Sequence, residues 1–199
     1  MYKFVKDTVE EIPSDKEEKE IWGEFKTLKV KETGEELYVF DKPDEIEVCK
    51  KKGNSFKRIA HIKITDGYIH DLKIDDEAYK SIKLGDYLFR RAVKEYNGWQ
   101  LDCGGTIAYK LYRKYDFVPL APKHIGSTKS LSMVHANAMR AYLEGEKDLP
   151  RIIPMVRRDR LQINNVMLDR LLKKFTEYVD ANYRGIYDSA DYMLKRVGE

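Results

Sequence analysis

The pattern of apolar and polar residues predicts a strand-rich first part of the chain. Short runs of β-branched, aromatic and aliphatic residues are separated by turn-prone residues, among them Asp41-Lys42-Pro43-Asp44 and the tight hairpin signal Asp66-Gly67. Strands joined by such short turns pair antiparallel. We therefore expect a meander with strands at residues 36–40, 45–50, 56–65 and 68–74.

Helical spacing appears before and after this meander. Ser14 or Asp15 can cap a helix over residues 16–28, with Ile21, Trp22, Phe25 and Leu28 on one stripe. After residue 76 the period changes from 2 to about 3.6, and one helical face carries Leu84, Leu88, Ala92 and Val93. A short strand over residues 99–103 and a helix from Thr106 to Tyr115 follow, which gives the order strand, helix, strand, helix.

This order indicates an α/β fold with a mixed, mostly antiparallel sheet flanked by helices. Beyond it the pattern is helical, with helices expected from Ser127 or Thr128 to Glu144, from Arg158 to Tyr183 and over residues 186–197. Residues 151–156 are expected to be an apolar connection interrupted by proline. The chain is accordingly divided into an α/β domain, residues 1–122, and a helical C-terminal extension packed on it, residues 123–199.

Composition narrows the class of protein. Of 199 residues, 42% are hydrophobic and 36% are charged, which excludes collagen-like and wholly disordered chains. No apolar run approaches the roughly 18 residues of a membrane-spanning helix, and the first residues carry no apolar signal core. We therefore expect a cytoplasmic protein with no membrane contact.

The charge distribution and the spacing of cysteine and histidine residues argue against nucleic-acid binding, metal binding and thiol catalysis. Residues 1–47 hold 8 Lys/Arg and 15 Asp/Glu, whereas residues 48–100 hold 12 and 7, so an acidic front precedes a mildly basic body. No block has the density of a nucleic-acid-binding domain, and nucleic acid is not an expected partner. Two cysteines and four histidines show no zinc-ligand spacing, so no metal is expected. Cys103 lacks the signature of a catalytic thiol.

Two segments carry a more specific signal. The first is the strand Tyr68-Ile69-His70-Asp71-Leu72-Lys73-Ile74, and the second is Ala108-x-x-Leu111-Tyr112-x-x-x-Asp116-Phe117. Both resemble segments of the GNAT family of N-acetyltransferases, which transfer an acyl group from acyl-coenzyme A to an amine. The first resembles the family's cofactor strand. The second resembles its Ala-x-x-Leu-Tyr-x-x-x-Gly-Phe segment, with Asp116 in place of glycine.

The resemblance implies an acyl-CoA N-acyltransferase-like fold and acetyl-CoA as co-substrate. Its phosphate-binding loop aligns with Lys80-Ser81-Ile82-Lys83-Leu84-Gly85, where Lys83 replaces the first glycine. Backbone N–H groups at the start of a helix bind phosphate, and a side chain at that glycine would crowd the approach. Lys80 and Lys83 either compensate as charges or face solvent on a loop that binds nothing. The cofactor-binding residues implied are Leu72, Ile74, Lys80, Lys83, Leu84 and Gly85.

The same resemblance implies catalytic roles. Tyr112 is the expected general acid toward the coenzyme sulfur, with packing in an amphipathic helix as the alternative. The backbone N–H of Leu72 is the expected oxyanion donor. His70 is the expected base toward the amine and Asp71 is its competitor, and strand alternation places these two side chains on opposite faces.

The C-terminal helices leave two readings open. They either cover the sheet or form a surface for a homodimer or protein partner. The leading functional hypothesis is transfer of an acetyl group to a primary amine acceptor, which is a small molecule or a protein. The alternative is a non-catalytic protein-binding module on a degenerate acetyltransferase fold, which the altered phosphate loop favours.

Overall fold

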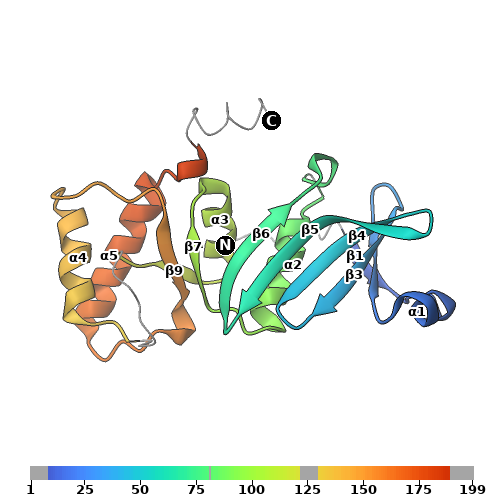
Figure 1. Ribbon diagram of the computed structural model, residues 1–199. Helices are drawn as coiled ribbons and strands as arrows, with labels where there is room; N and C mark the ends of the chain where they lie inside the picture. The colour runs from blue at the N-terminus through green and yellow to red at the C-terminus, as the bar shows by residue number, and fades with distance from the viewer. Residues whose placement is uncertain (1–8, 81, 122–129, 189–199) are drawn as a thin grey trace. The chain divides into compact units, whose positions relative to one another are not determined.

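The chain forms two compact units that meet between Gly98 and Trp99 in sequence (Figure 1). A computed structural model describes residues 9–80, 82–121 and 130–188. The expected domain boundary after residue 122 lies outside these residues. Within them, no helix combines the length and the apolar character that crossing a bilayer requires.

The described residues of the first unit form an antiparallel meander of six strands. Each strand pairs with the next along the chain, as the turn signals predict. The strands are β1 (Val9–Ile12), β2 (Lys26–Val30), β3 (Glu36–Lys42), β4 (Glu45–Lys52), β5 (Ser55–Thr65) and β6 (Tyr68–Ile74). The helices are α1 (Lys16–Trp22) and α2 (Leu84–Lys94). The four expected strands are confirmed, with ends shifted by a few residues.

The helix expected over residues 16–28 is wrong in its second half. It ends at Trp22, and Gly23 follows with φ +83, a conformation that favours glycine and stops a helix. Leu28 then lies in β2 opposite Leu37, where both side chains are fully buried. Cross-strand burial of these residues overrides the helical spacing. The side chains of Ile21 and Trp22 lie outside the described part of the structure.

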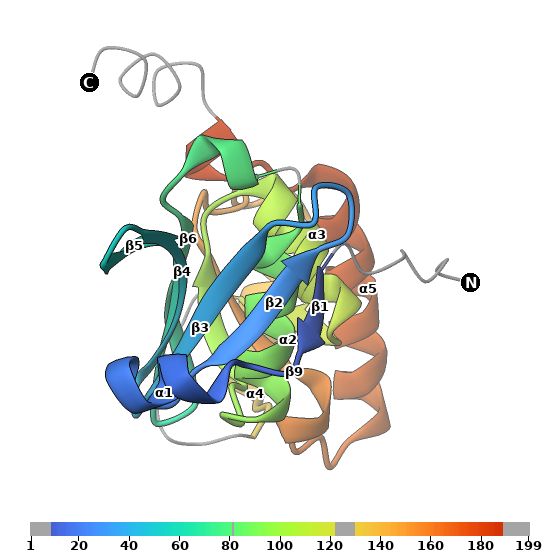
Figure 2. The same cartoon turned by 90° about the vertical axis from the view of Figure 1, so that its right-hand side faces the viewer.

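Helix α2 covers one face of the meander (Figure 2). Ile46, Ile62 and Leu72 are directly opposed on β4, β5 and β6, so their side chains share a face, and Ile46 and Ile62 are fully buried. Asp41 of β3, which is opposite Ile46, bonds to α2 and shows that this is the covered face. The core of the first unit therefore lies between α2 and the sheet.

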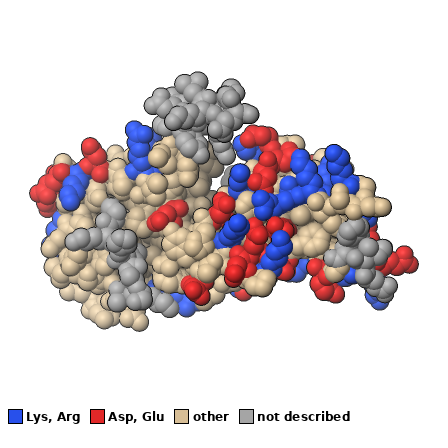
Figure 3. All heavy atoms as spheres, in the orientation of Figure 1, with Lys and Arg blue, Asp and Glu red and all other residues tan. Residues whose placement is uncertain are grey.

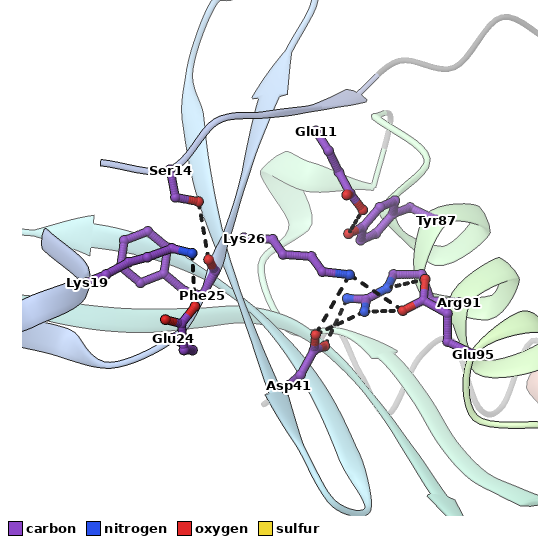
Figure 4. Close-up of polar contacts among 10 residues, drawn as sticks. All are labelled: Glu11, Ser14, Lys19, Glu24, Phe25, Lys26, Asp41, Tyr87, Arg91 and Glu95. Atoms are coloured by element: carbon purple, nitrogen blue, oxygen red, sulfur yellow. Dashed lines mark hydrogen bonds and ion pairs between the residues drawn. The ribbon is translucent and has the colours of Figure 1, made fainter. Parts of the chain in front are cut away.

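A buried arginine fixes α2 to the sheet (Figure 4). Arg91 is 3% exposed and forms two parallel hydrogen bonds to Asp41, at 2.9 and 3.0 Å. Its Nε donates to Glu95 at 2.9 Å, and the Lys26 ammonium lies 3.5 Å from the same carboxylate. The bond from Arg91 lowers the pKa of Glu95 despite partial burial. A charge this deeply buried is tolerated because every side of it meets an acceptor.

The described residues of the second unit form three strands and three α-helices. They are β7 (Gln100–Cys103), α3 (Thr106–Lys114), β8 (Phe117–Pro119), α4 (Met133–Leu143), β9 (Ile153–Arg157) and α5 (Val166–Asn182). Strand β9 lies between β7 and β8 and is antiparallel to both. The described part of the chain is thus α/β, and its strand pairs within each unit are antiparallel, in agreement with the mostly antiparallel sheet that the sequence predicts.

The expected connection over residues 151–156 is instead mostly strand. Pro154 has no N–H to donate, yet its carbonyl accepts from the Leu120 N–H at 2.9 Å. Ile153 and Met155 are fully buried on β9. Burial of these side chains between two neighbours decides the conformation in spite of the proline.

The long helix expected from Arg158 is shorter than predicted. Residues 158–160 form a single 3-10 turn, and α5 begins after Asn165, whose side chain accepts from the Met167 N–H at 2.8 Å. The asparagine cap, absent from the prediction, sets this start. Of the helix expected over residues 186–197, only Ile186–Asp188 is described, as a 3-10 turn.

Helices α4 and α5 lie side by side (Figure 1). The segments that lead into them run parallel through a bridge between Ser130 and Gln162. Helix α4 is capped by Ser132, whose hydroxyl lies 2.8 Å from Nδ1 of His135, and burial lowers the pKa of that imidazole. The caps expected at Ser127 or Thr128 lie outside the described residues.

Replacing Arg91 with alanine is expected to lower the free energy of unfolding by about 2–4 kcal/mol, because charged hydrogen bonds and buried volume are lost together. Urea unfolding followed by circular dichroism measures this. Lys94→Ala, an exposed position on the same helix, is the control and should change stability by less than about 0.5 kcal/mol. Equal effects of the two changes would show that Arg91 does not anchor α2.

Candidate functional site

Strand β6 is irregular at His70. Residues Ile64 and Ile69 are paired, and so are Lys63 and Asp71, so His70 is an extra residue with no partner on β5. Such a bulge interrupts strand alternation. His70 and Asp71 are both exposed, and the expectation that they lie on opposite faces by simple alternation is wrong at this point. Leu72 and Ile74 follow, half-buried, opposite Ile62 and Ala60.

A histidine of the neighbouring strand, which was not among the expected site residues, contacts β6. His61 of β5 is nearly fully buried, and its Nε2 lies 3.0 Å from Oδ2 of Asp71. Its Nδ1 lies 3.1 Å from Oδ2 of Asp75. Each ring nitrogen of His61 thus lies within hydrogen-bond distance of one carboxylate oxygen. Asp71 is therefore an exposed carboxylate oriented by a buried imidazole and a second carboxylate.

Asp75 is the best-connected group of this cluster. Arg58 Nε donates to it at 3.1 Å, and the Lys73 ammonium lies 3.5 Å away. Burial acts to raise the pKa of Asp75, but the hydrogen bond and charge of His61, with the charges of Arg58 and Lys73, outweigh it and lower the pKa. Asp75 thus stays ionised and holds His61 in place.

The predicted phosphate loop leads directly into α2. Lys83 occupies the cap position with φ +56 and ψ +30, a left-handed conformation, and α2 begins at Leu84. A side chain at this position in place of glycine costs roughly 1–2 kcal/mol. Lys83 is exposed, and Lys80 is exposed and pairs with Glu77. Leu84 is fully buried, and a Cβ at Gly85 would meet no atom within 4 Å.

Tyr112 belongs to the second unit. It lies on α3, is 8% exposed, and its ring centroid is 6.4 Å from that of Phe117. A buried tyrosine is compatible with both expected roles of Tyr112, packing in an amphipathic helix and acting as a general acid. Asp116, which stands where the family motif has glycine, follows α3 with φ +62. A left-handed residue just after a helix is a common way to end it.

Cys103 of β7 is buried. Burial raises the pKa of the Cys103 thiol to about 11, so the nucleophilic thiolate is scarce at neutral pH. His124, a histidine that could assist a Cys103 thiolate, lies outside the described residues. Among the described residues, no three His, Cys, Asp or Glu side chains are grouped to hold a metal ion.

A cavity of about 380 Å³ opens in the second unit, beside α3 and α5. Arg113 pairs with Asp180 and Arg158 pairs with Asp169 across its lining. Its walls therefore carry both signs of charge. The same mixture is visible on the first unit, where Lys and Arg interleave with Asp and Glu on the face shown in Figure 3. No predicted site residue lines the cavity.

No protein-family model matches the chain, and searches of curated proteins and of solved structures found no match either.

His61 was missed because its partners depend on the register. The Asp66-Gly67 turn pairs Thr65 with Tyr68, and unbroken pairing from there would place His70 opposite Lys63. The bulge places Asp71 there instead, on the face that carries His61. The turn could be read from the sequence, but the extra residue could not.

The low pKa of Asp75 predicts a pH-dependent contribution to stability. The group adds stability above its unfolded pKa, near 3.9, and loses it as pH falls through the lower folded value. Asp75→Asn should therefore be less stable than the wild type at pH 7, and the difference should narrow below about pH 4. Urea midpoints at both pH values measure this. Asp66→Asn, in an exposed turn, is the control; a constant difference for Asp75→Asn would contradict the prediction.

Proposed function

We propose that the protein is an N-acetyltransferase that binds acetyl-coenzyme A and transfers its acetyl group to a primary amine. The observation that carries the proposal is the backbone at Lys83 and Asp116. The family resemblance has glycine at both positions, and both residues adopt the left-handed conformation that favours glycine. A backbone conformation that favours glycine at both positions supports the resemblance to the family.

Lys83 supports the proposal more strongly than Asp116 does. Within the described residues, the non-glycine residues with positive φ are Asp66, Lys83, Asn97 and Asp116. Asp and Asn adopt this conformation comparatively often, whereas lysine does not. Asp116 also fulfils a general role after a helix. A strained lysine at the start of α2 therefore supports an inherited loop geometry suited to phosphate.

The proposed reaction is a direct transfer of the acetyl group from the coenzyme sulfur to the amine. The amine nitrogen attacks the thioester carbonyl, a C–N bond forms and the C–S bond breaks. The amine proton passes to a base, directly or through water, and the departing thiolate takes a proton from Tyr112. The proposed oxyanion donor is the backbone N–H of Leu72. Both His70 and Asp71 remain candidates for the base, and the bond from Asp71 to His61 favours Asp71.

A non-catalytic protein-binding module is the second candidate. Four exposed apolar residues favour it: Met133, Val134, Val166 and Met167. They lie in the first turns of α4 and α5, whose lead-in segments are paired. The ion pair of Lys80 with Glu77, which engages one of the two lysines expected at the phosphates, also fits this reading.

Thermal unfolding with coenzyme A, acetyl-coenzyme A and ATP tests cofactor binding. A coenzyme at 100 times its dissociation constant should raise the midpoint by about 5–10 °C, because it adds about 2.7 kcal/mol to stability. ATP should not reproduce the shift. If neither coenzyme shifts the midpoint at millimolar concentration, the acetyltransferase proposal is abandoned in favour of the protein-binding module.

Two substitutions at Lys83 separate backbone from charge. Lys83→Gly removes the strain and the crowding, and should bind coenzyme A at least as tightly as the wild type. Lys83→Ala keeps a Cβ but loses the charge, and should bind about 3–10 times more weakly. Isothermal titration calorimetry measures both. Equal affinity of the Ala variant and the wild type would rule out a compensating lysine.

In an assay with an identified amine acceptor, Asp71→Asn and Tyr112→Phe should each lower kcat by about 100-fold, as expected for loss of a general base or acid. His70→Ala should have a smaller effect. Matched coenzyme affinities would show that the loss is chemical. A larger effect at His70 than at Asp71 would reverse the assignment of the base.

A further inference from the structure

The chain after α5 turns back over the connection between β7 and α3 (Figure 1). The Tyr183 hydroxyl donates to the carbonyl of Cys103 at 2.5 Å and to that of Arg151 at 3.0 Å. The Tyr187 N–H donates to the carbonyl of Gly104 at 3.0 Å. We refer to residues 183–188 as the latch and to residues 103–106 as its seat.

Glycines let the latch lie against its seat. A Cβ at Gly185 would stand 2.1 Å from the carbonyl oxygen of Gly104, which no side chain tolerates. A Cβ at Gly104 would stand 2.6 Å from the Tyr187 ring. The Gly104-Gly105 pair is therefore covered by the latch.

One carboxylate closes the latch. Asp188 accepts hydrogen bonds from the Thr106 N–H at 3.1 Å, from the Thr106 hydroxyl, and from the Gly185 N–H at 2.7 Å. Gly105 at the cap of α3 has no side chain to bind the first N–H groups, so Asp188 performs this role from a distant part of the chain. Burial acts to raise the pKa of Asp188, but these hydrogen bonds prevail and lower it.

The latch and its seat differ in exposure. Tyr187 is 50% exposed and Asp188 is exposed, whereas Cys103, Gly104 and Gly105 beneath them are buried. Segments held by a few polar contacts open locally at a lower free energy than the core to which they are attached. The outer part of the latch has this character, while Tyr183, at its base, is almost fully buried.

We propose that the latch is a conformational gate: residues 185–188 open without unfolding the second unit, Asp188 holds them shut, and opening uncovers the seat and the start of α3. This goes beyond the proposed acetyl transfer and holds whether or not a coenzyme binds. Any ligand or partner that engages the start of α3 has to displace Asp188 first.

The two cysteines provide an internal test. Cys103 is in the seat, and Cys49 is buried in β4 of the first unit. Alkylation by iodoacetamide, followed for each cysteine by peptide mass spectrometry, reports how often each becomes accessible. Asp188→Ala should raise the rate at Cys103 about 10- to 100-fold, since several charge-assisted hydrogen bonds are lost. The rate at Cys49 should not change.

Asp148→Ala, an exposed position in the same unit, is the matched control and should leave both rates at wild-type values. Tyr187→Ala is a second variant that removes the ring over Gly104 and keeps Asp188, and it should also accelerate Cys103 alone. An unchanged Cys103 rate in both Asp188→Ala and Tyr187→Ala overturns the gate. A parallel rise at Cys49, or loss of circular dichroism, shows global unfolding and overturns it equally.

Discussion

The register of β5 is the constraint on which the first unit depends. This strand is the longest of the meander, and it pairs with β4 on one side and β6 on the other. Because side chains alternate between the faces of a sheet, a shift by one residue would exchange everything that β5 presents to α2 with everything that it presents to the opposite face. Ile62 belongs to the covered face and His61 to the opposite one. Two bulges, one with each neighbour, set which residues they meet.

The charged groups of the first unit depend on that register. Asp41 reaches Arg91 because it lies on the covered face, and Asp71 reaches His61 because the bulge at His70 turns it to the other. Both clusters join a nearly fully buried cation or imidazole to carboxylates that are more exposed. They differ in use. Arg91 holds a helix in place, whereas the cluster around His61 leaves the Asp71 carboxylate accessible, which is the property required of a base.

Both functional proposals concern the start of a helix, α2 in the first unit and α3 in the second. Helix α2 starts after a strained lysine, and α3 starts at a glycine pair and is capped by Asp188 from the end of the described chain. The start of a helix has free N–H groups that need an acceptor. At α3 a carboxylate of the chain supplies the acceptor, which is the physical basis of the latch. At α2 the proposed acceptor is the phosphate of a coenzyme.

The sequence by itself determined the elements whose signals are local. The hairpin at Asp66-Gly67, strand β6, helix α2 and the start of α3 at Thr106 are found where turn residues and periodicity predict them.

The sequence could not determine the elements whose conformation is decided by distant partners. Residues 26–28 continue a helical stripe but lie in a strand, because Leu28 is buried against Leu37. Pro154 interrupts an apolar run but lies in β9, because β9 is paired with β7 on one side and with β8 on the other. His61 and Asp188 gained their roles in the same way. Only the tertiary structure brings them to Asp71 and Thr106, since a hydrogen bond between residues far apart in the chain leaves no periodic trace in the sequence.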